Sequence, residues 1–272
     1  MVPTSAFAGM IVQGVLAVLI PLIAILYYYR KEKFSFVPFA VGAAVFLVFS
    51  QVLEKLLHLY VMTGNPVTME WLKAPLVLAV YGALAAALFE EGGRWIGMKL
   101  LMPRRREWKD GLSFGLGHGG IEALLISGLA SVQYLLYATL LNNGTFDEVL
   151  GSKLPAEAAT QLKTALTDSG FGLYLVGGLE RIPALFLQIA MSLMVLYAVR
   201  SGRLAMLLWA IVLHAGVDFF PGLYQAKVLP LWLVEILVWL TLPLSLYLIR
   251  RSRVWFGEAE RRPDASFTGV GR

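Results

Sequence analysis

Long apolar stretches alternate with short polar segments along most of this chain. Seven stretches are long enough to cross a bilayer, because a spanning helix needs about 20 mainly apolar residues. They cover approximately residues 5–29, 36–62, 74–101, 109–141, 171–199, 204–220 and 229–249. The pattern predicts an all-α, polytopic membrane helix bundle, with residues 1–253 forming a single transmembrane domain.

Two longer polar segments are predicted to lie outside the bilayer. Residues 142–170 carry apolar side chains near helical spacing, with Pro155 suited to a helix start and Gly170 to a stop. This insertion is predicted to form a short amphipathic helix on the outer face. Residues 254–272 are polar and contain Gly and Pro, so they are predicted to form a flexible cytoplasmic tail.

Composition supports a membrane protein and argues against a soluble or nucleic-acid-binding one. Of the 272 residues, 58% are hydrophobic and only 15% are charged, whereas soluble domains have about 45–50% apolar and about 25% charged residues. The net charge of +5 comes from short basic clusters between apolar stretches, which is typical of membrane topology rather than of nucleic-acid binding. The chain has no Cys, which excludes disulfides, thiol nucleophiles and thiolate metal sites.

The distribution of basic residues predicts how the chain is oriented in a cell membrane. Of the 23 Lys and Arg residues, 16 fall within 30–33, 99–109, 200–203 and 250–272, four fall in the alternate loops, and three lie inside spans. Cytoplasmic loops carry the excess of Lys and Arg. A multi-pass protein with its N-terminus outside and its C-terminus in the cytoplasm is therefore expected.

Ionisable residues inside the spans are the candidates for function, because burying a charge in lipid costs at least about 2.5–3.5 kcal/mol. Glu90, His118 and His214 come from three different spans. At a rise of about 1.5 Å per residue, each lies about 15–18 Å from the cytoplasmic edge, near the middle of a core about 30 Å thick. Their shared depth predicts one site, although any single residue could instead form a structural ion pair.

Each of these residues has a polar neighbour four positions away, on the same helix face. The three pairs are Glu90 with Arg94, His118 with Glu122, and His214 with Asp218. Two chemistries fit one Glu with two His. The side chains could activate water directly as general bases, or two His and a carboxylate could bind zinc. The chain contains neither HExxH nor GxSxG, the motifs of zincins and of many serine hydrolases.

Three short segments resemble motifs of the CAAX-protease and bacteriocin-processing superfamily of glutamic-type intramembrane endopeptidases. Residues 90–94 (EEGGR) resemble its EExxR motif, residues 114–118 (FGLGH) its FxxxH motif, and residues 214–218 (HAGVD) its Hxxx(Asn/Asp) motif. Within that superfamily the chain is most similar to the YhfC family of intramembrane proteases. Hallmarks similar to that family include GLGHGGIEA and the Glu180-Arg181 pair. The resemblance covers roughly residues 40–225.

The resemblance implies a role for each matched residue. Glu90 would be the general base that activates water, assisted by His118, and His214 with Asp218 would stabilise the oxyanion. Supporting roles are implied for Glu91, Arg94, Glu122, Glu180 and Arg181. Three features depart from related enzymes: Arg94 lies one residue nearer the glutamates than in the prenyl-protein endopeptidases, Asp218 stands where those enzymes have Asn, and Gln188 stands where a His is expected.

The sequence therefore predicts an intramembrane endopeptidase that hydrolyses a membrane-associated protein or peptide with Glu- and His-activated water. A metal-free, glutamic mechanism is favoured, since no HxxxH pair offers two ligands from one helix. If zinc is present, its expected ligands are Glu90, His118 and His214. The alternatives are a non-catalytic membrane scaffold or bacteriocin-immunity-like protein of the same fold, and, less favoured, a proton-coupled transporter. Lipid and a membrane protein or peptide are the expected partners, and nucleic acid is not.

Overall fold

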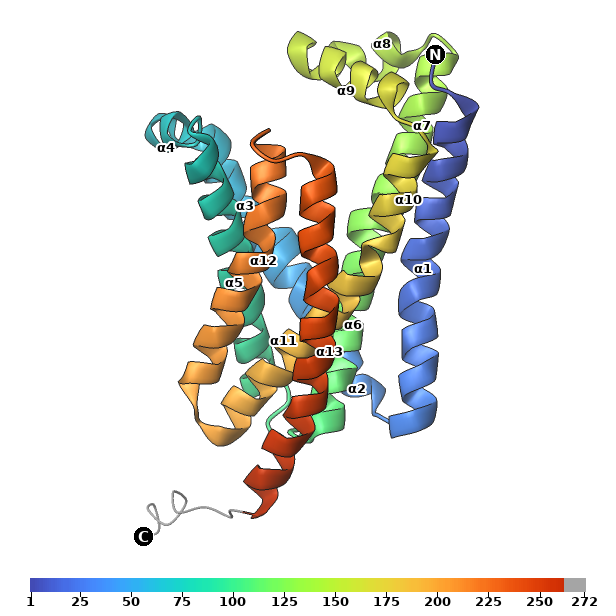
Figure 1. Cartoon of the computed structure of the whole chain (residues 1–272). Coiled ribbons are helices and arrows are strands. Elements are labelled where there is room, and N and C mark those ends of the chain that lie inside the picture. The colour runs from blue at the N-terminus through green and yellow to red at the C-terminus, as the bar shows by residue number, and fades with distance from the viewer. Residues whose placement is uncertain (262–272) are drawn as a thin grey trace.

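The computed structural model describes residues 1–261 of the chain, and these residues form a bundle of helices without strands (Figure 1). Seven helical stretches in this part of the chain are long and apolar enough to cross a membrane. They are Thr4–Glu32 (α1), Phe36–Gly64, Pro75–Leu100 (α5), Trp108–Asn142, Phe171–Ser201, Leu204–Gln225 (α12) and Leu231–Gly257. The last belongs to α13, which spans Leu231–Arg261. The predicted polytopic helix bundle is confirmed.

Three of the spans are built from more than one helix. Span two consists of α2 (Phe36–Val45), the π-helix η1 (Phe46–Glu54), α3 (Lys55–Leu59) and the π-helix η2 (Tyr60–Gly64). Span four consists of α6 (Trp108–Ala123), the π-helix η3 (Leu124–Leu129) and α7 (Ala130–Asn142). Span five joins α10 (Phe171–Leu179) to α11 (Arg181–Ser201) through Glu180. Wider π-helical turns are rare and frequently occur at functional sites.

Local signals explain where several spans begin and end. Lys33 adopts a left-handed conformation with φ of 48° and ends α1, while the Ser35 side chain accepts a hydrogen bond from the Val37 amide at the start of α2. A capping box of Glu107 and Asp110 begins α6. These local signals at the helix ends allow the chain to reverse direction within a few residues, as antiparallel spans require.

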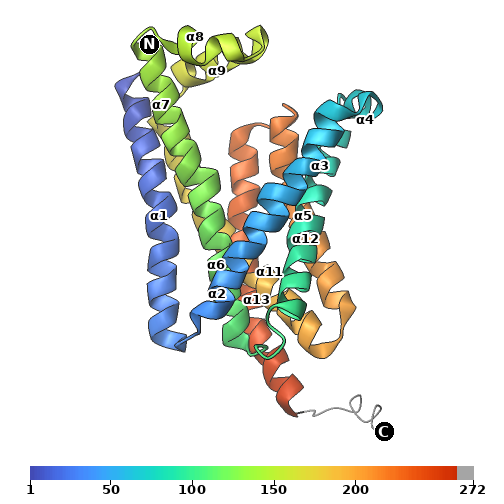
Figure 2. The same ribbon diagram turned by 180° about the vertical axis from the view of Figure 1, so that it is seen from behind.

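The helices outside the spans lie at the end of the bundle that carries the N-terminus (Figures 1 and 2). They are α4 (Pro66–Trp71), α8 (Phe146–Val149), the 3-10 turn η4 (Gly151–Lys153) and α9 (Ala156–Asp168). The insertion at 142–170 therefore contains the predicted helix, which begins directly after Pro155 and ends two residues before Gly170. Its Leu166 is buried in a small core with Met10 and Tyr174.

At the opposite end, α13 extends further than the sequence indicated. The helix continues to Arg261, although its span was predicted to end near residue 249 and a flexible tail to begin at 254. The remainder of the predicted tail, 262–272, lies outside the described residues. Within α13, Phe256 packs in the main hydrophobic core, and this burial explains why the helix does not stop at the membrane edge.

The main hydrophobic core surrounds α11, and between this core and the N-terminal end of the bundle the helices divide into two groups. Leu193, Val195 and their neighbours in α11 are fully buried, with α5, α6, α12 and α13 packed around this helix. Toward the N-terminal end, the helices separate into two groups (Figures 1 and 2). In one group α1 packs on α7 and α10, and in the other α5 packs on α12. The cavity described below is lined by residues of spans two to seven.

Candidate active site

The centre of the site is one buried arginine of α5 that holds two carboxylates. Glu90, Glu91 and Arg94 are all buried, with Glu91 and Arg94 completely so. Arg94 Nη2 lies 3.2 Å from Glu90 Oε2, and Arg94 Nη1 donates to Glu91 Oε1. The EExxR spacing places both carboxylates within one helical turn of the guanidinium. One cation thus compensates for the burial of two acids, which would otherwise be costly.

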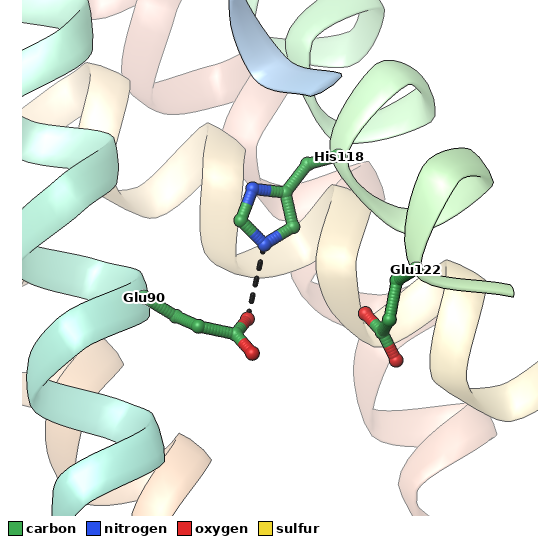
Figure 3. A group of neighbouring side chains, drawn as sticks. All are labelled: Glu90, His118 and Glu122. Atoms are coloured by element: carbon green, nitrogen blue, oxygen red, sulfur yellow. Dashed lines mark hydrogen bonds and ion pairs between the residues drawn. The ribbon is translucent and has the colours of Figure 1, made fainter. Parts of the chain in front are cut away.

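The histidine of α6 meets Glu90 across the helix interface. His118 Nε2 lies 3.0 Å from Glu90 Oε2 (Figure 3). The imidazole is fully buried and contacts the ring of Phe46 edge-on, while the ring of Phe114 stacks on it at a centroid distance of 6.2 Å. Phe114 precedes His118 by one helical turn, so the FxxxH spacing supplies the ring that orients the histidine.

The histidine of α12 reaches the same pair of glutamates from the other side. His214 Nδ1 lies 2.6 Å from Glu91 Oε1, and its Nε2 lies 4.0 Å from Glu90 Oε2. Asp218, one turn along α12, approaches His214 Nε2 at 3.4 Å. The predicted convergence of Glu90, His118 and His214 is therefore present, whereas their catalytic roles stay predictions.

Gln188 of α11 belongs to the site although the sequence assigned it no role. Its Nε2 lies 3.2 Å from Glu90 Oε2 and 2.5 Å from Glu122 Oε2, while its Oε1 accepts a hydrogen bond from Arg94. A single amide thus joins the acids of α5 and α6. The sequence did carry a signal, because Gln188 is a buried polar residue in a largely apolar span.

A second polar layer lies next to the site. Arg181 is buried and lies 3.6 Å from Glu122 Oε1 and 2.9 Å from Glu180 Oε1. Arg181 thus forms an ion pair with each of two carboxylates, on α6 and on the neighbouring Glu180. Glu54 does not join them: it lies 3.2 Å from His58, whose Nδ1 is 2.8 Å from the Tyr81 hydroxyl.

A cavity of about 730 Å³ is lined by several of these groups, among them Glu90, Gln188 and His214. Its walls include residues of spans two to seven, and its ionisable lining is unusually rich for a membrane interior. The ionisable residues that line it are Glu54, Lys55, His58, Glu90, Glu122, Glu180, Arg181, His214 and Asp218. Such a cavity offers a polar environment in which water can meet a peptide bond at membrane depth.

The chemistry of three side chains fits a divalent metal. Ligand atoms of Glu90, His118 and Glu122 lie within 4.8 Å of one another, and all three residues are buried and point toward a common space (Figure 3). One imidazole and two carboxylates are a suitable set for zinc or a similar ion. The set differs from the zinc ligands expected from the sequence, because Glu122 takes the place of His214. The Nδ1 atom of His214 is engaged by Glu91.

Comparison with known proteins agrees with the motifs and the fold. The model of the family described as YhfC intramembrane metalloprotease matches residues 16–238, a range that contains every residue of the site. The chain belongs to this family. It is also 39% identical over 254 residues to a protein of Bacillus subtilis (strain 168) named "Uncharacterized membrane protein YhfC", covering 93% of this chain and 98% of that protein. No solved structure gives a significant match.

The family description bears on two expectations. It supports the expectation of a protease, and it names a metalloprotease. Together with the buried Glu-His-Glu set, this gives no support to the metal-free mechanism that the sequence favoured. The wider placement among glutamic-type enzymes stays a prediction.

Proposed function

We propose that this chain is an intramembrane endopeptidase that hydrolyses a peptide bond of a membrane-associated protein or peptide. The observation that carries the proposal is the buried contact of Glu90 with His118 at a polar cavity within the membrane spans. Membership of a family described as intramembrane metalloproteases gives independent support. The alternatives, a non-catalytic scaffold and a transporter, give the Glu90–His118 contact no role in hydrolysis.

Glu90 is the residue that takes a proton from the attacking water. Its Oε2 atom lies 3.0 Å from His118 Nε2, and the residue lines the cavity, so a water beside the carboxylate can reach a bound carbonyl. A carboxylate within hydrogen-bond reach of water acts as a general base and afterwards returns the proton to the leaving amine. Arg94 and Gln188 hold the same oxygen at 3.2 Å each, and this fixes the direction in which the carboxylate points.

A divalent metal has a place in this site. Glu90, His118 and Glu122 would hold it, as their buried ligand atoms already lie close together. When bound, such an ion makes water nucleophilic at neutral pH and polarises a carbonyl oxygen. Gln188 orients two of the ligands, since its amide donates to both Glu90 and Glu122, in the manner of the outer-shell contacts that support metal ligands elsewhere.

His214 is placed to stabilise the negative charge that develops on the substrate carbonyl. Its Nδ1–H donates to Glu91 at 2.6 Å, and this leaves Nε2 directed toward Glu90 and Asp218. When Nε2 is protonated, it donates a hydrogen bond to an oxyanion in the cavity. Asp218 at 3.4 Å stabilises the protonated ring.

A metal-free, glutamic mechanism is the second candidate, and one observation favours it. Three donors, from Arg94, His118 and Gln188, already surround Glu90 Oε2, as they would around a general base that works without an ion. Metal analysis of purified protein separates the two. About one ion per chain, lost in Glu122→Ala and retained in the surface variant Glu70→Ala, supports the metal mechanism. An ion-free protein that cleaves peptides supports the glutamic one.

The test of the proposed function is cleavage of a library of membrane peptides by purified protein in liposomes. Glu90→Gln is expected to lower the rate by at least about 100-fold, because the general base is lost. Glu70→Gln is the matched control, since Glu70 is exposed and pairs only with Lys73 among the described residues. Chelator and added zinc form the remaining arms. A protein that is folded by circular dichroism and cleaves no member of the library would contradict the proposal.

A further inference from the structure

Among the described residues, spans two and four pack closely on each other through α2 and α6. Gly42 of α2 lies against the Phe114 carbonyl of α6, and Gly117 of α6 lies against the Phe39 carbonyl of α2. A Cβ atom at either glycine would overlap the opposite backbone. Reciprocal small residues of this kind allow helices to approach closely in a membrane. The two spans are therefore fixed to each other in the half near the C-terminal end of the bundle.

Beyond this crossing the two spans diverge toward the N-terminal end (Figure 2). Each passes through a π-helical stretch just above the crossing, η1 in span two and η3 in span four. Within the described chain, α3 packs on η1 and η2 of its own span and contacts α5 through His58 and Tyr81, while α7 packs on α1 and its neighbours. In this part of the two spans, η1, α3 and η2 of span two and η3 of span four carry residues that line the cavity, whereas α7 carries none.

The cavity reaches the surface of the bundle between these outer halves. Met62 of η2 and Ile126 of η3 both line the cavity, yet their side chains are 37% and 49% exposed. Leu59 and Leu129, on the same two spans, are also exposed. We call the surface between Leu59, Met62, Ile126 and Leu129 the lateral opening. Its edges are apolar and at membrane depth, whereas the cavity behind it contains Glu90.

We propose that the lateral opening is the entrance through which a transmembrane segment of a substrate protein passes from the lipid to Glu90. This inference rests on the proposed function and names its substrate class. The apolar edges of the opening match an apolar helix. The polar interior of the cavity supplies hydrogen-bonding partners for an unwound stretch of backbone, whose polar groups would have no partners in lipid.

Size limits what can enter. A spanning helix of about 20 residues is about 30 Å long and about 10 Å wide, far larger than the cavity of about 730 Å³. Only a short unwound stretch of the substrate therefore enters, while the helical remainder stays between the two spans. The fixed glycine crossing lets the outer halves move apart without loss of the packing around α11.

Since the chain has no Cys, the opening can be closed by chemical bridging without background reaction. Leu59→Cys with Leu129→Cys, joined by reducible bis-maleimides of graded length, should slow cleavage of a membrane-spanning peptide by at least about tenfold, and reductant should restore the rate. Cleavage of a short water-soluble peptide with the same scissile sequence should change by less than about twofold. The control is a disulfide of Gly14→Cys with Ser131→Cys, whose Cβ atoms would lie 3.4 Å apart and which joins α1 to α7 away from the cavity.

A second measurement does not depend on catalysis. A photoreactive phenylalanine analogue replaces Ile126 in the otherwise native chain. The protein is then irradiated in liposomes together with a biotinylated, leucine-rich peptide of about 20 residues, which is long enough to span the membrane. Peptide adducts are expected at Ile126 and not at Ile23, an exposed isoleucine of α1. Equal peptide labelling at both positions, or lipid adducts alone at Ile126, would overturn the entrance. Adducts at Ile126 in a protein that cleaves no peptide would preserve the entrance and defeat the proposed function instead.

Discussion

Single side chains decide how this membrane interior tolerates so many charges. Arg94 has no exposed surface, yet it serves Glu90, Glu91 and Gln188 together. Only a planar guanidinium presents several donors in fixed directions, so a lysine could not replace it at this position. Glu90 and Glu91 are thereby oriented by one residue of the same helix, which also compensates for the burial of their carboxylates.

Gln188 provides the first test at this scale. Gln188→Met keeps the side-chain length but removes the amide that joins Glu90 to Glu122, and activity is expected to fall by at least about tenfold. The free energy of unfolding should fall by about 1–3 kcal/mol, because two buried carboxylates each lose a donor. Cleavage rates and thermal unfolding in detergent measure the two effects. Gln161→Met on exposed α9 is the control, and a fully active Gln188→Met protein would refute the positioning role.

Arg181 is predicted to act in folding rather than in chemistry. Its removal in Arg181→Met leaves Glu122 and Glu180 without their cation, and breaking such a buried pair costs about 3–5 kcal/mol. Thermal unfolding should therefore show a large loss of stability, while the folded fraction keeps its cleavage rate. Lys163→Met removes an exposed pair with Asp147 and should cost at most about 1 kcal/mol. A stable but inactive Arg181→Met protein would show that the residue belongs to the catalytic machinery.

The sequence predicted the depth of the site in the membrane better than it predicted which residues form the site. Depth along each span placed Glu90, His118 and His214 at one level, and the structure brings them together. Depth does not specify how each helix is rotated or how far a long side chain reaches. For this reason the sequence did not place Glu122 among the expected zinc ligands, although its carboxylate lies within 4.8 Å of the ligand atoms of Glu90 and His118. Gln188 carries no charge and so did not stand out among the ionisable residues.

At the scale of helices, lipid makes the spans predictable. Every backbone group must be satisfied within its own helix, so long apolar stretches identify helices to within a few residues, as for Phe36–Gly64 and Phe171–Ser201. The π-helical stretches η1, η2 and η3 were not predicted. A π-turn adds one residue without changing composition, and it therefore leaves no mark in hydropathy.

The crossing of α2 and α6 offers a prediction about packing. Gly117→Ala places a methyl group against the Phe39 backbone, so the helices must separate, and the expected cost is about 1–3 kcal/mol. Gly120→Ala, on the same helix, meets only the Pro21 side chain at 3.6 Å and should be neutral or slightly stabilising. Thermal unfolding of both variants in the same detergent tests this. Equal stability of the two would mean that the crossing is not tightly packed.

Across the whole molecule, charge and topology agree. The short connections after α1, α5 and α11 and the end of α13 all lie at the end of the bundle opposite the N-terminus (Figure 1). Within the described residues these segments hold 14 basic residues, and the other two of the predicted cytoplasmic set, Arg262 and Arg272, lie outside the described residues. The structure thus gathers the basic loops at one end, as antiparallel spans require, and leaves α9 at the other. Which end faces the cytoplasm stays a prediction of the positive-inside rule.

The last prediction concerns this orientation. Single cysteines are introduced at two exposed positions, Ser152 near α9 and Pro103 in the basic loop before α6, in a chain that has no other Cys. In intact cells a membrane-impermeant maleimide is expected to label Ser152→Cys, because the sparsely charged end faces outward. Pro103→Cys should react only after the membrane is permeabilised. Both positions reacting equally in intact cells would indicate leakage or dual topology, and the reverse pattern would invert the assignment. In that case α3, which borders the lateral opening and lies in the half of the bundle near α9 (Figure 2), would lie in the inner leaflet, and the proposed substrate segment would enter from that leaflet.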